Sequence, residues 1–277
     1  MKTGGYYFAT IPTRSFEALM ASCLLSRHVL LSLFLSLPLP LFAADSHWSY
    51  SGDTGPAHWA ELGDSLQNQL CSKGTTQSPI DIDLKHAVRH KENTRNLSIH
   101  YARSPLTLIN NRHTIQATPT GEDMLTYNGD EYRLVQFHFH TPSEHQFNHH
   151  AYPMEMHLVN QDKEGHLLVV GLMIKEGKEN HELAKLWKHL PQEPGKEVQM
   201  DSKDDPDLGK LLPKQGTGKH IRYQGSLTTP PCSESVQWVV FEQPIELSHR
   251  QIKQFRQLFP DNHRPTQALQ ARVVEED

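Results

Sequence analysis

The sequence predicts a single domain that is mainly β-structure, with peripheral helices around one large, mostly antiparallel twisted sheet. Three observations predict this fold class. Short runs rich in β-branched and aromatic residues recur along the chain, and Gly, Pro, Asn and Asp separate them, as turns separate strands. Hydrophobic residues make up 36% of the chain and charged residues 21%, so the chain can form a packed core. No repeat or low-complexity linker divides residues 47–277, a length that one sheet-rich domain can have.

The first element along the chain is an apolar run at 29–42 that carries no charge. Arg27 precedes it and Ala43-Ala44 follow it, which is the order of a secretory signal peptide. The run is shorter than the roughly 20 residues of a membrane-spanning helix, so we expect no membrane anchor. The sequence therefore predicts a signal peptide over 1–44, with Met20 as the expected true start, and a periplasmic or secreted domain over 45–277.

Three cysteines occur in the chain, and two of them, Cys71 and Cys232, remain once such a leader is removed. An exported chain with two cysteines favours one disulfide bond between them. Two separate buried thiols are the alternative that the residues by themselves leave open.

Eight runs have the composition of strands, and turn residues lie between them, which favours antiparallel neighbours. They are LSIHYA (97–102), LTLINN (106–111), HTIQAT (113–118), DMLTYN (123–128), EYRLVQFHFH (131–140), MEMHLVN (154–160), HLLVVGLMI (166–174) and SVQWVVF (235–241).

Two segments have helical periodicity. The segment 181–190 stops at Pro191 and places four apolar side chains on one face, namely Leu183, Leu186, Trp187 and Leu190. The segment 248–259 begins at Ser248 with Gln251 three residues later, which is the pattern of a capping box. Its apolar stripe consists of Ile252, Phe255 and Phe259. We expect both stripes to face the core.

The net charge is −5 and the basic residues are scattered, which argues against nucleic acid as a partner. The 19 histidines are an excess that suggests metal binding, although most of them are expected to be ordinary surface residues.

A candidate metal site begins in the predicted strand 131–140. Side chains alternate between the two faces of a strand, so His138 and His140 share one face with Gln136, while Phe137 and Phe139 point the other way. By itself a His-x-His pair is only moderately specific for metal.

The predicted strand 154–160 repeats this arrangement, because Glu155 and His157 share a face. If the two strands are neighbours, His157 becomes a third nitrogen ligand. Three neutral imidazoles with an open fourth position are typical of catalytic rather than structural zinc. Gln136 and Glu155 stand where they can accept the second ring N–H of a ligand histidine and orient it.

These segments belong to a longer series, which runs in order HWSY (47–50), GPAHW (55–59), QSPIDI (77–82), NNRH (110–113), YRLVQFHFH (132–140), SEH (143–145), EMHLV (155–159), GSLTTPP (225–231) and NHRP (262–265). In this series the sequence resembles the α-class carbonic anhydrases over nearly all of residues 45–277. The short TPS segment at 141–143 resembles the bacterial, exported members.

The resemblance implies one Zn²⁺ per chain, held by His138, His140 and His157 at the base of a conical cleft. It implies that Thr228 accepts a hydrogen bond from zinc-bound hydroxide and passes its own proton to Glu144. The implied reaction is the reversible hydration of carbon dioxide to bicarbonate and a proton.

Further roles follow from the same resemblance. His113 is the implied proton shuttle, supported by Tyr50, Asn111 and Gln116. Arg112 departs from the family pattern, and its charge is expected to lower the pKa of His113 or change how its ring moves. The substrate site is implied to consist of Thr229, which lines the anion site, and an apolar wall of Val159, Val169, Leu227, Val236 and Trp238.

The remaining expectations concern inhibitors, the disulfide, a dimer and a second metal site. The family implies sulfonamide and anion inhibitors, and a disulfide at Cys71 and Cys232. Exposed edge strands are compatible with a homodimer. The loop histidines His145, His149 and His150 suggest a second metal site, but we favour solvated side chains there.

Two alternatives to an enzyme remain. A non-catalytic, carbonic-anhydrase-like binding module is expected to lack a ligand histidine or the threonine, and this chain lacks neither. A periplasmic zinc-storage protein is suggested by the histidine count, and it is expected to bind several zinc ions weakly rather than one tightly.

Overall fold

A computed structural model describes residues 47–63, 65–90, 97–213 and 218–277. The predicted signal peptide and the expected start at Met20 lie outside these residues. Within them, no helix has the length and apolar character needed to cross a membrane.

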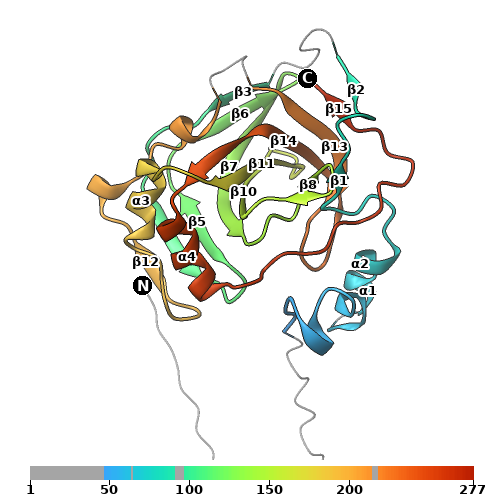
Figure 1. Cartoon of the computed structure of the whole chain (residues 1–277), viewed down its shortest axis with the longest axis horizontal. Coiled ribbons are helices and arrows are strands. Elements are labelled where there is room, and N and C mark those ends of the chain that lie inside the picture. Colours follow the sequence, from blue (N-terminus) through green and yellow to red (C-terminus); the bar gives the residue numbers. More distant parts are fainter. Residues whose placement is uncertain (1–46, 64, 91–96, 214–217) are drawn as a thin grey trace, which may run out of the picture. The chain divides into compact units, whose positions relative to one another are not determined.

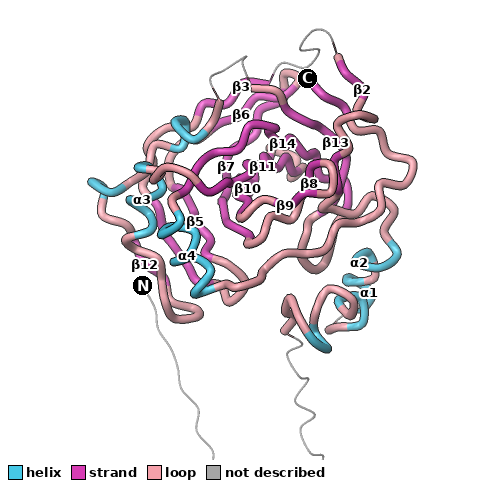
Figure 2. The backbone as a smooth tube through the Cα atoms, viewed as in Figure 1, coloured by secondary structure: helices cyan, strands magenta, loops and turns pink. Residues whose placement is uncertain are grey.

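A twelve-stranded sheet dominates the described part of the chain (Figure 1, Figure 2). Its main path follows the order β12 (Glu197–Gln199), β4 (Leu106–Asn110), β5 (Ile115–Pro119), β7 (Asp130–His140), β10 (Met154–Gln161), β11 (Leu167–Glu176), β14 (Glu234–Leu247), β13 (His220–Ser226), β15 (Glu275–Glu276) and β2 (Val88–Arg89). Off this path, β3 (Leu97–His100) pairs with β6 (Met124–Tyr127), which pairs with β7. A second sheet contains β1 (Asp81–Ile82), β8 (Gln146–Phe147) and β9 (His150–Ala151).

Most neighbours in the large sheet are antiparallel, and the exceptions are the parallel pairs β11–β14 and β15–β2. The predicted fold class is therefore confirmed. The eight predicted strands match β3, β4, β5, β6, β7, β10, β11 and β14.

The sequence reasoning missed β13, although this strand is buried along most of its length. Its Arg222 breaks the apolar pattern that marks a central strand. The structure compensates this buried cation with the carboxylates of Glu275 and Asp277. Since Glu275 lies on β15, the pairing could not be read from β13 alone.

Helix α4 (His249–Leu258) begins after Ser248, and the predicted capping box with Gln251 is present. Helix α3 (His181–Trp187) ends earlier than predicted, although Leu190 is still buried. The two helices pack together beside the sheet (Figure 1), and Trp187 Nε1 donates to the Gln251 carbonyl at 2.8 Å. The short helices α1 (Ser65–Asn68) and α2 (Leu70–Lys73) were not predicted.

The central strands bury side chains on both of their faces. The larger core receives Phe137 and Phe139 from β7, and Met156 and Leu158 from β10. Val159 points to the opposite face and joins a second, smaller cluster. Both faces of these strands are therefore fixed by packing.

A disulfide joins Cys71 to Cys232, as predicted. It lies in a third apolar cluster with Trp59, against which Trp48 and Tyr50 pack. The bond therefore ties α2 to the loop between β13 and β14.

Removing this disulfide is expected to destabilise the fold. It closes a loop across a sequence separation of 161, which corresponds to about 4–5 kcal/mol of loop-closure free energy, less any native strain. Urea unfolding of the Cys71→Ser/Cys232→Ser variant is expected to show a loss of this order. An unchanged free energy of unfolding, or free thiols in the unfolded, non-reduced mature protein (residues 45–277), would contradict the expectation.

Candidate metal centre

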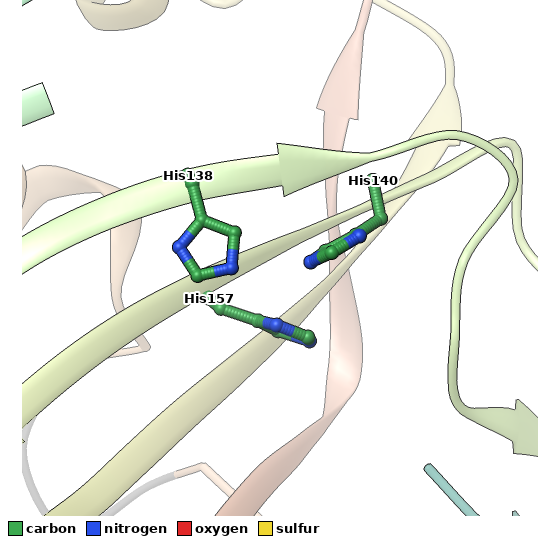
Figure 3. Close-up of side chains that lie close together, drawn as sticks. All are labelled: His138, His140 and His157. Carbon is green, nitrogen blue, oxygen red and sulfur yellow. The ribbon is translucent and has the colours of Figure 1, made fainter. Parts of the chain in front are cut away.

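The antiparallel pairing of β7 with β10 brings three histidines together. His157 lies directly opposite His138, and Glu155 lies opposite His140. The three imidazole rings converge (Figure 3), with centroids 5.0 Å apart for His138 and His140, 5.3 Å for His138 and His157, and 4.6 Å for His140 and His157. The sequence predicted His157 as a third ligand only if the two strands were neighbours, and β7 and β10 are neighbours.

One nitrogen of each ring is occupied by a hydrogen bond. His138 Nδ1 lies 2.8 Å from Gln136 Oε1, and His157 Nε2 lies 2.8 Å from Glu155 Oε1. An amide or carboxylate oxygen accepts, so these nitrogens carry the proton and the other nitrogen of each ring keeps its lone pair.

His140 is held in the same way, since its Nδ1 donates to the backbone carbonyl of Asn262 at 2.8 Å. The sequence did not indicate this partner. The Nε2 atom of His140 is buried and has no hydrogen-bond partner. One nitrogen from each of the three histidines lies within 4.8 Å of the others. Three converging lone pairs, one of them otherwise an unsatisfied buried atom, fit a zinc ion with three protein ligands.

The carboxylate of Glu155 is a buried anion that bonds directly to one of the three rings. Burial would raise its pKa, but the charges of His145 and His157 and their hydrogen bonds outweigh burial and hold the pKa well below its usual value. Gly171 on β11 lies opposite His157 and leaves room for this carboxylate, because a Cβ there would lie 3.1 Å from Glu155 Oε1.

The three imidazoles differ in their affinity for protons. Burial lowers the pKa of both His138 and His140. For His157, burial acts in the same direction, but the nearby Glu155 carboxylate outweighs it and raises the pKa. A neutral imidazole is the form that binds metal, so His157 is the candidate ligand for which protons would compete most strongly.

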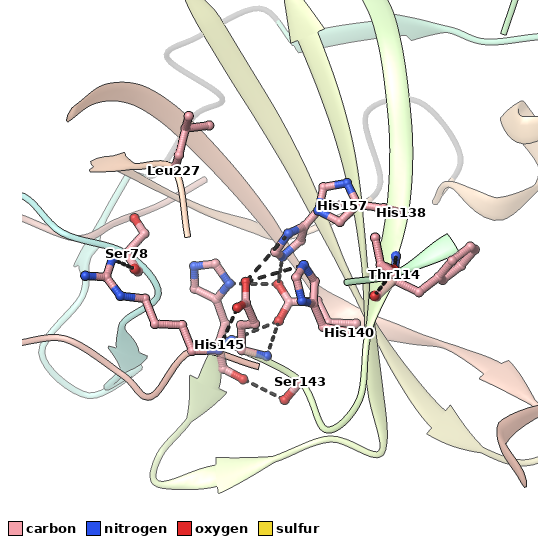
Figure 4. A network of polar contacts seen from close by, with 12 residues as sticks. Ser78, Thr114, His138, His140, Ser143, His145, His157 and Leu227 are labelled. Carbon is pink, nitrogen blue, oxygen red and sulfur yellow. Dashed lines mark hydrogen bonds and ion pairs between the residues drawn. The ribbon is translucent and has the colours of Figure 1, made fainter. Parts of the chain in front are cut away.

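The expectation that His145 is a solvated loop residue is wrong. This side chain is fully buried and belongs to the polar network in Figure 4. It bonds through Nδ1 to Glu155 Oε1 at 2.7 Å and through Nε2 to Tyr223 Oη at 2.7 Å. The buried His145 thus bonds to the Glu155 carboxylate through both its ring and its backbone N–H. His149 and His150 are exposed as expected, and the three do not form a joint metal-binding group.

Glu144 is fully buried beside the three rings. Its Oε1 accepts from the backbone N–H of Arg264 at 2.8 Å, while its Oε2 has no hydrogen-bond partner and lies 3.5 Å from His140 Nε2. The implied hydrogen bond from Thr228 is therefore not formed in this structure, because the free oxygen faces the imidazoles instead. Thr228 itself is buried in the loop between β13 and β14.

His113 stacks on Trp48, with ring centroids 3.6 Å apart and planes 8° apart. Burial, followed by the charges of His47 and Arg112, lowers the pKa of His113 to about 4. The expected effect of Arg112 on this pKa therefore has the predicted sign, but burial is the larger cause. Arg112 has a φ of 78°, a backbone conformation that is uncommon for a non-glycine residue.

The residues expected to support His113 lie in different settings. Tyr50 meets its ring edge-on at 6.5 Å, and the two line a cavity of about 390 Å³. Asn111 Oδ1 accepts from the backbone N–H groups of His113 and Thr114, so it shapes the turn. Gln116 lies opposite His138 in the pairing of β5 with β7.

The five residues of the implied apolar wall belong to one cluster. Val159, Val169, Val236 and Trp238 are buried in the smaller core, and Leu227 packs against it. The Trp238 ring lies 4.8 Å from that of His157, so this apolar surface borders the histidine cluster.

Residues 54–277 match a family model described as eukaryotic-type carbonic anhydrase. This chain belongs to that family. A carbonic anhydrase of Klebsiella pneumoniae is 42% identical over 253 residues, which cover 90% of this chain and 98% of that protein. A carbonic anhydrase of a Nostoc species is 39% identical over 236 residues, which cover 85% and 88%.

Solved structures of the family show the same fold. The α-carbonic anhydrase of Thermovibrio ammonificans, solved in complex with the inhibitor sulfanilamide, superposes with a TM-score of 0.74. It is 42% identical in sequence, and the match covers 83% of this chain and 99% of that chain.

Two buried residues of this carbonic anhydrase family member received no role from the sequence. Asn262 holds His140, and Arg264 holds Glu144 through its backbone N–H. The Arg264 guanidinium also donates to the backbone carbonyls of Ser78 and Cys71. The signal that could have found them is the NHRP segment at 262–265, which is one of the segments that resemble the family.

The proton equilibrium of His113 gives a direct test of the stacked geometry. We expect its ring to be neutral at pH 7 and to titrate near pH 4, as followed by NMR of its ring protons. Trp48→Ala is expected to raise the pKa toward the ordinary value of about 6.5, because the ring gains solvent. Arg112→Asn removes the charge, tolerates the positive φ and is expected to raise the pKa by less. A wild-type titration near 6.5 would contradict the geometry.

Proposed function

We propose that this chain catalyses the reversible hydration of carbon dioxide to bicarbonate and a proton, using one zinc ion per chain. The observation that carries the proposal is the convergence of three imidazole lone pairs at a buried centre, in a chain whose relatives are named carbonic anhydrases. When bound, zinc would supply the Lewis acidity that lowers the pKa of water to about 7, a magnitude known from carbonic anhydrases themselves.

Three groups on this chain hold the ligand rings in the metal-binding tautomer. Gln136, Glu155 and the carbonyl of Asn262 accept from the ring nitrogens that face away from the centre. Partners of this kind orient the ligands and raise their basicity. The Glu155 carboxylate would also bring a negative charge close to a metal held by these rings.

We assign the binding of carbon dioxide to the apolar wall formed by Val159, Val169, Leu227, Val236 and Trp238. Carbon dioxide carries no net charge, so an apolar surface beside the metal admits it while excluding competing water. Thr228 is proposed to orient the nucleophile, which requires its hydroxyl to donate to Glu144, a hydrogen bond that is not formed in this structure. Thr229 is the proposed contact for the product anion. The same apolar and anionic subsites would accept sulfonamide and anion inhibitors.

We assign proton export to His113. In the stacked position its pKa of about 4 makes it a poor acceptor at pH 7. The proposal therefore requires the ring to leave Trp48 and reach solvent, where an imidazole of pKa about 6.5 both accepts and releases protons. Tyr50, Asn111 and Gln116 are proposed to support the path between the metal and this ring.

The export of this enzyme to the periplasm or medium, by means of a signal peptide over 1–44, is part of the proposal. It is supported by the leader-like apolar run and by the Cys71–Cys232 disulfide, which oxidising compartments favour. A homodimer also remains a proposal.

The main experiment is a measurement of carbon dioxide hydration before chelation, after chelation and after zinc is added back. We expect activity to disappear with the metal, return at one zinc per chain and be blocked by a sulfonamide. His157→Ala is expected to lose both zinc and activity. Several weakly held zinc ions without hydration activity would favour storage instead, and one tightly held zinc without activity would favour a binding module.

Replacing the proposed shuttle should slow turnover without affecting the metal. His113→Ala is expected to bind zinc normally and to lose about 10-fold or more in kcat at low buffer, while kcat/KM stays near that of the wild type. Added imidazole buffer should restore the rate because it carries the proton instead. A variant whose rate does not respond to buffer would count against the shuttle role.

A further inference from the structure

One amide side chain lies between the metal-ligand strand and the turn that carries His113. Asn262 is 1% exposed, and its backbone makes two hydrogen bonds to the end of β7. Its N–H donates to the Thr141 carbonyl at 3.0 Å, and its carbonyl accepts from His140 Nδ1 at 2.8 Å. The position of this backbone therefore determines where the His140 ring is held.

The side chain of Asn262 makes three further hydrogen bonds. Its Oδ1 accepts from the Thr141 N–H at 2.7 Å. Its Nδ2 donates to the carbonyls of His113 and Phe139, each at 2.9 Å. One N–H meets the oxygen and two carbonyls meet the nitrogen, so these partners determine which way the amide points.

These contacts fall where β7 ends and its regular ladder stops. Thr141 is fully buried, so its N–H and carbonyl need partners that the sheet does not provide. Asn262 provides both of them. The same amide reaches the carbonyl of His113, whose own N–H is held by Asn111 Oδ1 at 3.0 Å.

We propose that Asn262 is a positioning residue that couples the two halves of the site, because its backbone carbonyl holds the ligand His140 and its buried side-chain amide holds the backbone of His113. The inference rests on the proposed function for its meaning in catalysis. The geometric claim is that displacing this amide disturbs the metal ligand and the His113 turn together.

A purely structural role is the competing explanation, and the chain offers a matched control. Asn160 is also fully buried with three side-chain hydrogen bonds, which it makes to Tyr101, Leu158 and Leu168. None of these partners belongs to the site. Asn160→Ala therefore removes the same amount of buried hydrogen bonding without touching His140 or His113.

The experiment compares Asn262→Ala with Asn160→Ala in the full-length mature protein. Three quantities are measured: the zinc dissociation constant, the ring-proton NMR shifts of His113, and the thermal midpoint. Because His113 stacks on Trp48, the indole ring current shifts these resonances and reports the position of the turn even without zinc. His113→Ala assigns the signals.

Both variants are expected to lose thermal stability. Only Asn262→Ala is expected to bind zinc about 10- to 100-fold more weakly, the loss typical for a group that orients a metal ligand. Only this variant is expected to lose the ring-current shift of His113. At saturating zinc, its turnover should become more dependent on added imidazole buffer.

Asn262→Asp is the second variant if the alanine change prevents folding. Its carboxyl keeps the acceptor for Thr141 but carries at most one proton where the amide has two. We therefore expect the shift of His113 to change and zinc affinity to stay closer to that of the wild type.

Equal effects of Asn262→Ala and Asn160→Ala on zinc affinity and on His113 would overturn the proposal. So would a change in only one of the two quantities for Asn262→Ala, since the claim is that the buried amide fixes both the His113 turn and the backbone carbonyl that holds His140. A wild-type protein that binds one zinc but does not hydrate carbon dioxide would refute the proposed function, while the zinc and NMR measurements would still decide the role of Asn262.

Discussion

The register between β7 and β10 is the constraint on which the rest of the site depends. His138 and His157 face each other only in this register, and a slip of one residue would turn His157 to the opposite face. The opposite face is the larger core, where Phe137, Phe139 and Leu158 are completely buried. Apolar packing on one face of the strands thus determines the position of the imidazoles on the other.

The second requirement is that every buried polar group around these rings finds a partner. The Glu155 carboxylate accepts four hydrogen bonds: from the N–H groups of Glu144 and His145, from the His145 ring and from the His157 ring. This hydrogen-bond network continues through the His145 ring to the Tyr223 hydroxyl, and from there to Ser78 Oγ at 2.8 Å. A buried anion costs several kcal/mol unless it is compensated in this way, so the loop that carries His145 is drawn into the interior. At this centre His140 Nε2 and Glu144 Oε2 remain as buried polar atoms without a hydrogen-bond partner.

Much of this could be anticipated from local patterns. The alternation of Gln136, His138 and His140 placed three polar side chains on one face, and Ser248 with Gln251 placed the start of α4. Prediction failed where the deciding partner is distant in sequence. The strand β13 contains Arg222, whose buried charge is compensated by the carboxylates of Glu275 and Asp277, and the buried ring of His145 bonds to the Glu155 carboxylate on β10. The stack of Trp48 on His113 has the same origin, because the residues are 65 positions apart and only folding brings the rings into contact.

The sequence by itself determined the class of fold, the three histidines and the order of the family motifs, because strand alternation and motif spacing are local properties of the chain. The tertiary structure decided which ring nitrogen each histidine presents, that Asn262 and Arg264 serve the site, and that His113 lies stacked with a low pKa. These features depend on hydrogen bonds and desolvation between segments that are distant in sequence. Asn262 and His140, for example, are more than 100 residues apart. Such contacts leave no periodic pattern in the sequence, and only the folded chain specifies them.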